Sequence, residues 1–390
     1  MFNFRRRRIY LDYASAPPVL PEAIAAMRKA ERLVGNPGAI HAEAVAAKKS
    51  LEDSRARIAS VIGCKARETL FTSGLTEANN LAIIGYAKHL ERTKRTLAGT
   101  HWLVSSIEHD SVLASFAEVE RLGGSVSYVE PNERGIITPE AVAAALRKET
   151  VFVSVGWANN EIGTVQSLGK IAQTIRKTHQ NVVFHSDAGQ APLYLATLVH
   201  SLGVDLLALG GNKLYGPHGV GALYIGKTEL APVLYGGKQE RGMRAGTENV
   251  ALAAGFATAF EIVAGERDAE AKRLRSLRDT LARGFEKIPG LVVNGDLDNA
   301  LPHMLNISFE LRAASFKTAE YITLALDAKG IAISTKSACR EGEEIRSHIV
   351  AALGGPAWRA ENTLRFSRGS DTSRQDIEAV VKIMGLTIGR

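Results

Sequence analysis

Cysteine is scarce in this chain, since its 390 residues include only Cys64 and Cys339. Two thiols cannot build the disulfide framework of a small secreted protein, and they cannot by themselves supply a four-thiolate zinc site. We therefore expect a reducing, cytoplasmic setting and no metal centre. Long apolar runs are also lacking, and none reaches the roughly 18 residues that a membrane-spanning helix needs. A membrane partner is therefore not expected.

A strong excess of one charge is missing too. The formal net charge is +7, and the four arginines at positions 5–8 account for more than half of it. The remainder is too weakly basic to indicate a domain dedicated to nucleic acid, so no direct nucleic-acid partner is expected. Hydrophobic residues make up 45% of the chain, which is enough apolar surface to offset chain entropy and to exclude disorder as the main state.

Residues 20–260 alternate between helical and strand-like periodicity. Strands separated by helices predict a mainly parallel sheet sandwiched by helices, which is an α/β fold. The predicted helices cover 21–33, 43–62, 111–122, 139–146 (with Thr138 as N-cap) and 168–177, and the predicted strands cover 102–107, 126–129, 151–155, 182–184, 206–209 and 221–225. Ligands of such sheets bind at the carboxyl ends of the strands.

The pattern changes near residue 250. Residues 251–285 are nearly all helix formers and predict one long or broken helix. Beyond it, short strands are predicted at 292–293, 306–309, 331–334 and 364–366, with helices at 317–328, 345–353 and 374–384. We therefore expect a large α/β domain over residues 15–260 and a smaller α+β C-terminal domain formed by residues 1–14 and 261–390.

Two residues follow the ends of predicted strands. Asp187 ends the strand near 184, and Lys213 lies in a glycine-rich turn just after the strand at 206–209. Taken singly, Asp187 could equally be the N-cap of the next helix. Lys213 on its own could be an ordinary surface lysine, which is the usual position of this residue type. Together they fit pyridoxal phosphate, because a lysine forms a Schiff base with its aldehyde and a carboxylate keeps its pyridine nitrogen protonated.

Other polar residues fit the same site. The segment 72–77 precedes a helix expected to begin near Glu77, so its backbone N–H groups and hydroxyls form either a phosphate site or an ordinary capping box. His109 follows another strand and is suited to stacking on a ring or moving protons. The pair Asn159 and Asn160 follows the strand at 151–155 and offers amide hydrogen bonds.

The C-terminal part adds a thiol and a guanidinium. Cys339 lies in a polar segment between Lys336 and Arg340, where cations favour the thiolate, although nearby glutamates oppose this and an incidental surface cysteine is the alternative. Arg365 lies in an alternating strand and is suited to binding a carboxylate with two hydrogen bonds, the alternative being an ordinary ion pair. Cys64, beside a glycine at a helix end, is interpreted as structural.

The whole set resembles the cysteine desulfurases, a group within the class V aminotransferases, which are fold-type I pyridoxal phosphate enzymes. The resemblance covers nearly the whole chain and rests on an ordered series of segments. These are YLDYA at 10–14, GNP at 35–37, FTSG at 71–74, NNLA at 79–82, EH at 108–109, NNEIG at 159–163, KLYGP at 213–217, ERGMRAGT at 240–247, SAC at 337–339 and LRFS at 364–367.

The resemblance implies a role for each matching residue. Lys213 would bind the cofactor covalently, Asp187 would pair with the ring nitrogen, and His109 would stack on the ring and assist proton transfer. Asn160 and Gln190 would contact either the hydroxyl-bearing side of the cofactor ring or the substrate. The phosphate would be held by Gly74, Leu75, Thr76 and Asn212, with Thr247 reaching in from the second subunit of a homodimer.

The reaction implied is desulfuration of L-cysteine. Arg365 would bind the substrate carboxylate, and Cys339 would take the sulfur as a persulfide, leaving L-alanine. The sulfur would then pass to an acceptor protein, with an iron–sulfur cluster scaffold, a tRNA-thiolation protein and a thiamine-pathway carrier all open.

Two departures from the family pattern stand out. Such enzymes usually carry a serine two residues before a histidine that directly precedes the lysine, whereas this chain has Gly210 and Asn212 there. Each lost hydrogen bond to the phosphate would cost on the order of 1.5–3 kcal/mol. The stretch ASAP at 14–17 and Lys336 also differ from the usual residues. We expect activity to survive, because the lysine, aspartate, histidine, cysteine and arginine all remain.

Three readings stay open at this level. The first is a cysteine desulfurase; the second is a related pyridoxal phosphate enzyme such as a selenocysteine lyase, an aminotransferase or a β-lyase. The third is a degenerate homologue that serves as a binding partner, which Gly210 and Asn212 suggest. Dependence on Cys339 separates the first from the second, and bound cofactor separates both from the third.

Overall fold

The computed structural model describes residues 8–94, 96–310, 318–335 and 346–388. Its centre is a seven-stranded sheet with the order β2-β8-β7-β6-β5-β3-β4. The strands are β2 (Thr69–Thr72), β3 (His101–Ser105), β4 (Ser125–Val129), β5 (Thr150–Ser154), β6 (Val183–Asp187), β7 (Leu206–Gly210) and β8 (Gly221–Ile225). Only β8 runs antiparallel to its neighbours in this sheet. The prediction of a mainly parallel sheet is confirmed.

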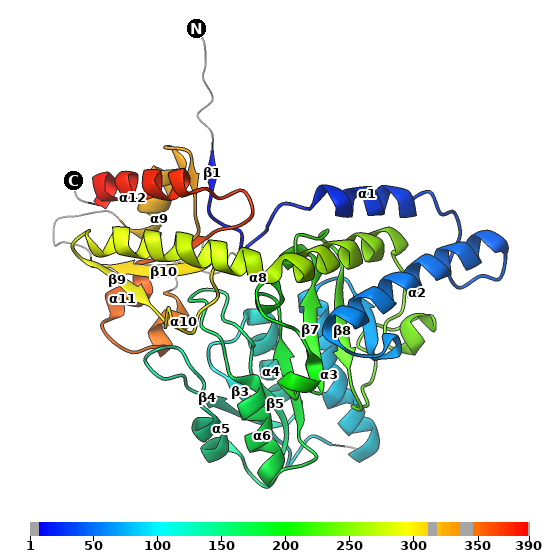
Figure 1. Ribbon diagram of the computed structural model, residues 1–390. Coiled ribbons are helices and arrows are strands. Elements are labelled where there is room, and N and C mark those ends of the chain that lie inside the picture. Colours follow the sequence, from blue (N-terminus) through cyan, green and yellow to red (C-terminus); the bar gives the residue numbers. More distant parts are fainter. Residues whose placement is uncertain (1–7, 95, 311–317, 336–345, 389–390) are drawn as a thin grey trace.

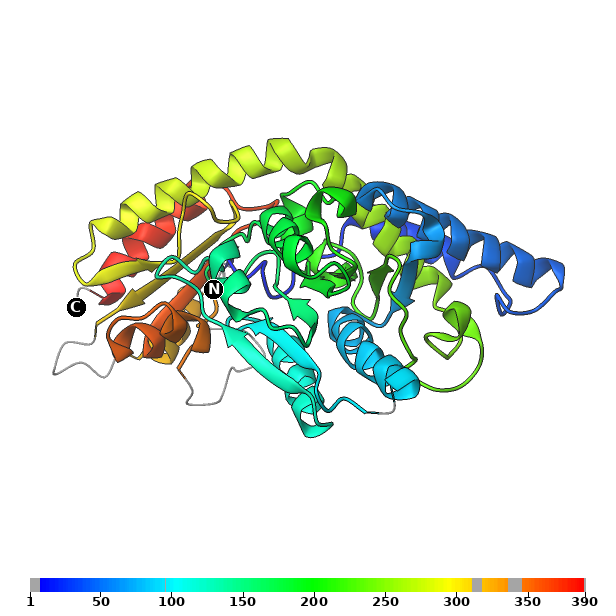
Figure 2. The same ribbon diagram turned by 90° about the horizontal axis from the view of Figure 1, so that it is seen from below.

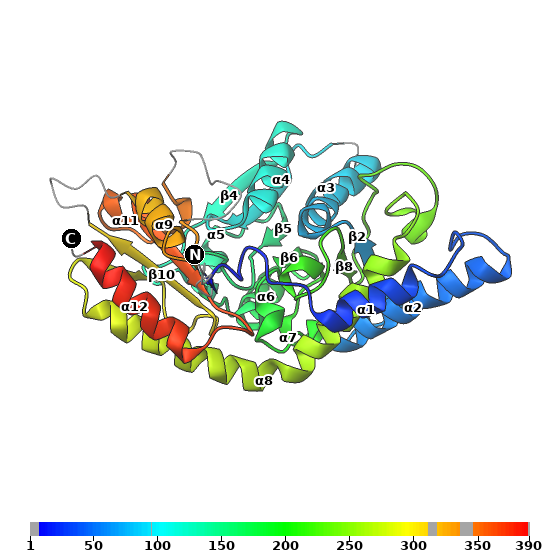
Figure 3. The same cartoon turned by 90° about the horizontal axis from the view of Figure 1, so that it is seen from above.

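Helices cover both faces of this sheet (Figure 3). Alternate strand residues point to opposite faces, so Trp102 and Phe152 pack beneath α3 (Leu75–Lys94) and α4 (Asp110–Arg121). Their neighbours Leu103 and Val153 belong to the core on the other face. That face is covered by α6 (Leu168–Thr178), α7 (Val199–Leu202) and part of α8 (Val250–Glu286). The strands are buried on both sides, as a parallel sheet requires.

The predicted helix at 251–285 is a single helix, α8, of 37 residues. Its first part packs against α1 (Pro21–Ala30) and α2 (Ala42–Ile62), and its last part packs against α12 (Arg374–Ile388) and β9 (Leu291–Asn294). Figure 1 shows α8 crossing the top of the molecule between these groups. The helix runs through residue 260 without a break, so the two parts of the molecule share one rigid element.

A three-stranded antiparallel sheet follows, with the order β12-β10-β9 (Figure 2). It contains β9, β10 (Met304–Phe309) and β12 (Thr363–Ser367). A separate parallel pair joins β1 (Ile9–Tyr10) to β11 (Ile331–Ala332). The remaining helices are α5 (Pro139–Ala145), α9 (Ala319–Asp327), α10 (His348–Ala352) and α11 (Ala357–Glu361).

Most differences from the predicted elements concern their ends. Thr138 caps α5 as predicted, since its hydroxyl accepts a hydrogen bond from the N–H of Ala141. The helix expected near Glu77 begins at Leu75 instead. The strand expected at 331–334 stops after two residues, and α11 had no periodic signal because five residues make barely more than one turn. Within the described part of the chain, no helix has the length and apolar character to cross a membrane.

Candidate active site

A cavity of about 340 Å³ lies at the carboxyl ends of the parallel strands. Ten of the predicted site residues line it, and they come from both halves of the chain. They are Gly74, Leu75, Thr76, His109, Asn160, Asp187, Gln190, Asn212, Lys213 and Arg365. Thr247 is exposed and is not part of this lining. Cys339 lies outside the described residues.

Asp187 is the last residue of β6, and both of its carboxylate oxygens are fixed. Oδ1 accepts a hydrogen bond from the N–H of Gly189 at 2.8 Å, and Oδ2 accepts one from Asn79 Nδ2 at 2.7 Å. Asp187 is therefore not the N-cap of a helix, which was the alternative interpretation. Its carboxylate is held in place at the cavity wall, where it can accept a further hydrogen bond from a ligand.

Asn79 connects Asp187 to His109. The same Nδ2 that binds Asp187 also donates to Ser111 Oγ at 2.9 Å, and Ser111 Oγ lies 2.9 Å from His109 Nδ1. The N–H of Ser111 donates to His109 Nδ1 at 3.1 Å. A backbone N–H can only donate, so Nδ1 is the acceptor and the neutral ring carries its proton on Nε2. This arrangement makes Nε2 the nitrogen able to give a proton or a hydrogen bond to a ligand.

Sequence reasoning did not single out Asn79 or Ser111. Both are buried, and their contacts join α3, α4 and β6. The segment at 79–82 was noted only as part of the family pattern. The spacing of residues along the chain does not show which distant side chain the buried Asn79 binds. Asn159 also lines the cavity, but its amide is already paired: Oδ1 accepts the N–H groups of Glu161 and Ile162, and Nδ2 donates to Ile107 O at 3.0 Å.

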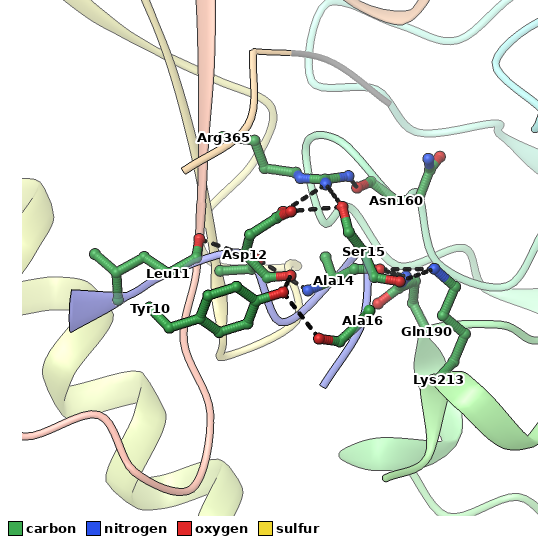
Figure 4. A network of polar contacts seen from close by, with 11 residues as sticks. Tyr10, Leu11, Asp12, Ala14, Ser15, Ala16, Asn160, Gln190, Lys213 and Arg365 are labelled. Carbon is green, nitrogen blue, oxygen red and sulfur yellow. Dashed lines mark hydrogen bonds and ion pairs between the residues drawn. The ribbon is translucent and has the colours of Figure 1, made fainter. Parts of the chain in front are cut away.

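Lys213 ends a short 3-10 helix directly after β7. Its Nζ donates to the carbonyl oxygens of Ala14 at 3.0 Å and Ser15 at 2.6 Å (Figure 4). Gln190 Nε2 donates to the same Ala14 oxygen at 2.9 Å. The loop that carries Lys213 is tightly closed, because the N–H of Gly216 bonds to Gly211 O and a β-carbon at Gly216 would lie 2.9 Å from that oxygen.

Arg365 lies in the middle of β12 with only 2% of its side chain exposed. Nη2 forms hydrogen bonds with Asp12 Oδ1 at 2.9 Å and Ser15 Oγ at 2.6 Å, and Nη1 donates to Asn160 O at 2.8 Å (Figure 4). The ion pair, which was the alternative interpretation of Arg365, is therefore present, and it places the guanidinium at the cavity. Ser334, whose backbone pairs with Arg365, precedes Cys339 by five residues.

Glu108 adds an unexpected acid to the cavity wall. The pKa of Glu108 is raised to about 8, mainly by burial and also by the charge of Asp187, while the N–H of Gly156, which donates to Oε1 at 2.7 Å, acts in the opposite direction. At neutral pH this carboxyl group is mostly protonated and can donate a hydrogen bond. Gly156 is required here, since a β-carbon at that position would lie 2.8 Å from Glu108 Oε2.

The start of α3 is suited to binding an anion, because the positive end of the helix faces the cavity. N–H groups in a first helical turn have no partner within the helix, and here they belong to residues that line the cavity. Glu77 in this turn is neutralised by Arg244, whose Nε donates to Oε1 at 2.9 Å. The other carboxylate oxygen of Glu77 accepts a hydrogen bond from the N–H of Ser73. The capping interaction is therefore formed, although the same helical turn borders the cavity.

Comparison with known proteins places this geometry in a family. The family model described as aminotransferase class-V matches residues 9–380. The chain belongs to this family. It is 38% identical over 382 residues to the cysteine desulfurase IscS of Dictyoglomus turgidum, covering 97% of this chain and 94% of that protein. It is 37% identical over 396 residues to the IscS of Methylobacillus flagellatus, covering 99% and 93%.

Solved structures agree with this family and with the predicted fold. A NifS-like protein superposes with a TM-score of 0.89 at 28% identity, covering 98% of this chain and 99% of that one. SspA in complex with cysteine superposes with a TM-score of 0.79 at 32% identity, covering 92% and 98%. DndA from Streptomyces lividans is also 32% identical, with a TM-score of 0.75 and coverage of 92% and 99%.

The aminotransferase class-V family consists of pyridoxal phosphate enzymes, and the residues present fit this cofactor. The cavity brings together a lysine, an anchored carboxylate and a helix N-terminus, which suit an aldehyde, a protonated ring nitrogen and a phosphate. Asn212 and Gly210 remain the departures, with Asn212 at the cavity wall and Gly210 behind it. Among the described residues, no group of three or more His, Cys, Asp or Glu side chains is arranged to hold a metal ion.

Proposed function

We propose that this chain is a cysteine desulfurase that converts L-cysteine to L-alanine and carries the sulfur as a persulfide on Cys339. The observation that best supports this is the meeting of Lys213, Asp187 and Arg365 at one cavity. Two of these groups suit the cofactor and the third suits an amino-acid carboxylate. When bound, the cofactor supplies an electron sink that accepts the electrons of bonds broken at the substrate carbon atoms.

Each polar group around the cavity has a task in this proposal. Lys213 would bind the cofactor aldehyde and, through its amine, would be the group at this wall able to hold or move a proton. Asp187 holds the ring nitrogen protonated, and His109 presents its Nε2 proton to the ligand. Asn160 and Gln190 bind the ring hydroxyl side, and Arg365 binds the substrate carboxylate.

The phosphate is held by the first turn of α3 and by the loop before Lys213. Gly74 and Leu75 supply backbone N–H groups, Thr76 supplies a hydroxyl, and Asn212 supplies a neutral amide donor. This set carries fewer side-chain donors than the family pattern, since position 210 has none.

Sulfur transfer takes place between two sulfur atoms. The thiolate of Cys339 attacks the substrate sulfur, a new S–S bond forms, and the bond between that sulfur and the substrate β-carbon breaks. The electron pair of the broken bond stays on the carbon side and is protonated there. The sum is L-cysteine plus enzyme thiol giving L-alanine plus enzyme persulfide, with no external oxidant or reductant.

The persulfide sulfur then passes to an acceptor protein in the cytoplasm. We propose an iron–sulfur cluster scaffold or a tRNA-thiolation protein, because the relatives that match the whole chain carry the name IscS. We also propose that residues 15–260 form a large cofactor-binding domain, and that residues 1–14 and 261–390 form a small domain. The pairing of β1 with β11 supports the assignment of the N-terminal residues to the small domain.

We further propose a homodimer in which Thr247 contacts the cofactor phosphate of the other subunit. Thr247 is exposed and lies away from the cavity of its own chain, as such a role requires. Large apolar side chains are also exposed, notably Ile40 at 97%, Val34 at 76% and Tyr235 at 63%, which suits an interface. Light scattering of the purified protein should give twice the monomer mass of 41.9 kDa.

The decisive experiment incubates the purified protein with L-cysteine and a reductant and measures sulfide and alanine together. Equal amounts of both products are expected, together with an absorbance band near 420 nm from the bound cofactor (~420 nm is the usual position for a protonated Schiff base of this cofactor). Lys213→Ala should lose the band and both products. Cys339→Ala should keep the band and lose sulfide formation.

Other results would point elsewhere. A Cys339→Ala variant with full activity would favour a related lyase or aminotransferase that does not use this thiol. A protein that binds no pyridoxal phosphate at millimolar concentration would favour a non-catalytic homologue. A Lys213→Ala variant that keeps both colour and activity would rule out the cofactor assignment.

A further inference from the structure

Leu75, the first residue of α3, lies between the ends of two central strands. A β-carbon placed on Gly210, the last residue of β7, would lie 2.7 Å from Leu75 Cγ and 2.8 Å from Leu75 Cδ1. A β-carbon placed on Gly189, two residues beyond β6, would lie 2.8 Å from the same Cδ1. Carbon atoms from separate residues attract each other best at about 3.5–4.0 Å and repel strongly at these shorter distances. One methyl group therefore fills the space that side chains at both positions would need.

This packing limits the donors that the cavity can offer. The loop from β7 to Lys213 contains Gly210, Gly211 and Asn212, so Asn212 is its single residue with a polar side chain before the lysine. A hydroxyl at position 210 needs a β-carbon, and that β-carbon requires the Leu75 side chain to move from its present place. The leucine and the missing donor are therefore coupled by one steric contact.

Leu75 also limits what can stand beside Asp187. The β-carbon position at Gly189 is 3.1 Å from Asp187 Oδ1 as well as 2.8 Å from Leu75 Cδ1, so a side chain at position 189 would meet both residues. Leu75 is half-buried and packs on the core beneath α3, so movement of its side chain would lose those contacts.

We propose that Leu75 is a positioning residue that sets the affinity of this site for pyridoxal phosphate. Its side chain occupies the space that β-carbons at positions 210 and 189 would need, and it thereby disfavours a phosphate-binding hydroxyl at position 210. The proposal rests on the cofactor assignment made above, but its steric part is a property of the protein alone. Leu75 and Gly210 should consequently behave as a coupled pair, and replacement of either alone should disturb the site.

The test compares Gly210→Ala and Gly210→Ser, each made with Leu75 and with Leu75→Ala. Melting temperature without added cofactor reports the steric contact, and absorbance titration with pyridoxal phosphate reports binding. With Leu75 present, both substitutions should lower the melting temperature by several degrees, because the added atoms overpack the contact with the leucine side chain. With Leu75→Ala, neither substitution should lower it further.

The serine and alanine variants then separate the hydroxyl from the β-carbon. In the Leu75→Ala background, Gly210→Ser should bind pyridoxal phosphate about tenfold more tightly than Gly210→Ala, as expected for one added hydrogen bond to a charged group. Gly189→Ala tests the second position that contacts the same Leu75 methyl group. It should also lower the melting temperature, and Leu75→Ala should restore the melting temperature of this variant.

Three results would overturn the proposal. They are an unchanged melting temperature for Gly210→Ala, a failure of Leu75→Ala to rescue it, and equal affinities of the two double variants for the cofactor. Failure of the cofactor assignment looks different, since the wild-type protein would then bind no pyridoxal phosphate while the melting temperatures still showed the coupling.

Discussion

At the scale of single residues, the cavity depends on side chains that hold other side chains. Asp187 is fixed by Asn79, and the same amide bonds to Ser111, which in turn bonds to His109. Hydrogen bonds between buried polar groups of this kind fix the positions of their members. The carboxylate and the imidazole are therefore linked through one asparagine, and each end of the link can be broken separately.

Asn79→Ala should weaken binding of pyridoxal phosphate by about tenfold or more, because Asp187 loses a donor and is no longer held at the ring-nitrogen position. Ser111→Ala is the matched variant, since it removes the hydroxyl that joins Asn79 to His109 and leaves the bond from Asn79 to Asp187 in place. It should lower the turnover rate and leave cofactor affinity nearly unchanged. Cofactor titration and steady-state kinetics on both variants check this, and equal cofactor affinities for the two would contradict it.

Glu108 should make stability depend on pH on the alkaline side of neutrality. Its pKa is raised from 4.5 to about 8, so between these values the folded protein holds a proton that the unfolded chain has released. Stability from this group is complete at low pH and is lost as pH rises toward about 8. The melting temperature should fall between about pH 6.5 and 8, and Glu108→Gln should remove this fall.

The pH range of that measurement lies above the range in which a second buried group, a histidine, affects stability. Burial lowers the pKa of His185 to about 3, so this histidine adds stability as pH rises, but only up to its ordinary value of 6.5. Glu120→Gln is the control, because Glu120 is exposed on α4 and the substitution should keep the slope of the wild-type protein. A slope above pH 6.5 that survives in Glu108→Gln would assign the effect to another group.

At the scale of elements, α8 sets the distance between the central sheet and the small sheet. Two of its glycines lie where other helices come close. A β-carbon on Gly255 would lie 2.5 Å from Met27 Cγ in α1, and one on Gly284 would lie 2.4 Å from Val381 Cγ2 in α12. A third glycine in the same helix, Gly265, is exposed and has no atom within 4 Å of that position.

These glycines provide a matched pair of substitutions. Gly284→Ala should destabilise the protein by about 1–3 kcal/mol, because the added methyl group meets a β-branched side chain that cannot move aside easily. Gly265→Ala should stabilise it by about 0.5–1 kcal/mol through the higher helix propensity of alanine. Chemical denaturation of both variants checks the signs, and stabilisation by Gly284→Ala would show that α12 can shift away from α8.

At the scale of the whole molecule, the segment from β1 to Ala16 ties the two sheets together. Arg365 of the small sheet binds Asp12 and Ser15, and Lys213, which follows the central sheet, binds the backbone of the same segment. The N-terminal segment therefore lies between the group that suits a substrate carboxylate and the group that suits the cofactor. Its position makes it part of the cavity wall and not a peripheral tail.

Asp12→Asn should destabilise the protein, because it leaves the buried guanidinium of Arg365 without its carboxylate partner. The guanidinium would lose its charged partner, and the free energy of unfolding should fall by about 2–4 kcal/mol. An amino-acid carboxylate should then restore stability more strongly than in the wild-type protein, because it supplies the missing negative charge. Thermal melts with and without L-alanine measure this, and Ser15→Ala, which keeps the charge pair, should show a smaller loss.

Much of the architecture follows from the sequence because it depends on local periodicity. Alternation of strand and helix patterns predicts a parallel sheet, and a run of helix formers predicts one long or broken helix where α8 lies. Strand ends and the helix start point to Asp187, Lys213, Asn160 and the first turn of α3, and the family resemblance adds Gln190; all of these line the cavity. These features depend on spacing along the chain, which one sequence contains in full.

The tertiary structure alone decided which of these residues act on one another. Asn79 and Asp187 are separated by 108 residues, and Asp12 and Arg365 by 353, so no local pattern relates them. The exclusion between Leu75 and Gly210 is likewise invisible until α3 and β7 are packed together. Periodicity determines which face of an element is buried, whereas contact between distant side chains depends on how those faces are packed.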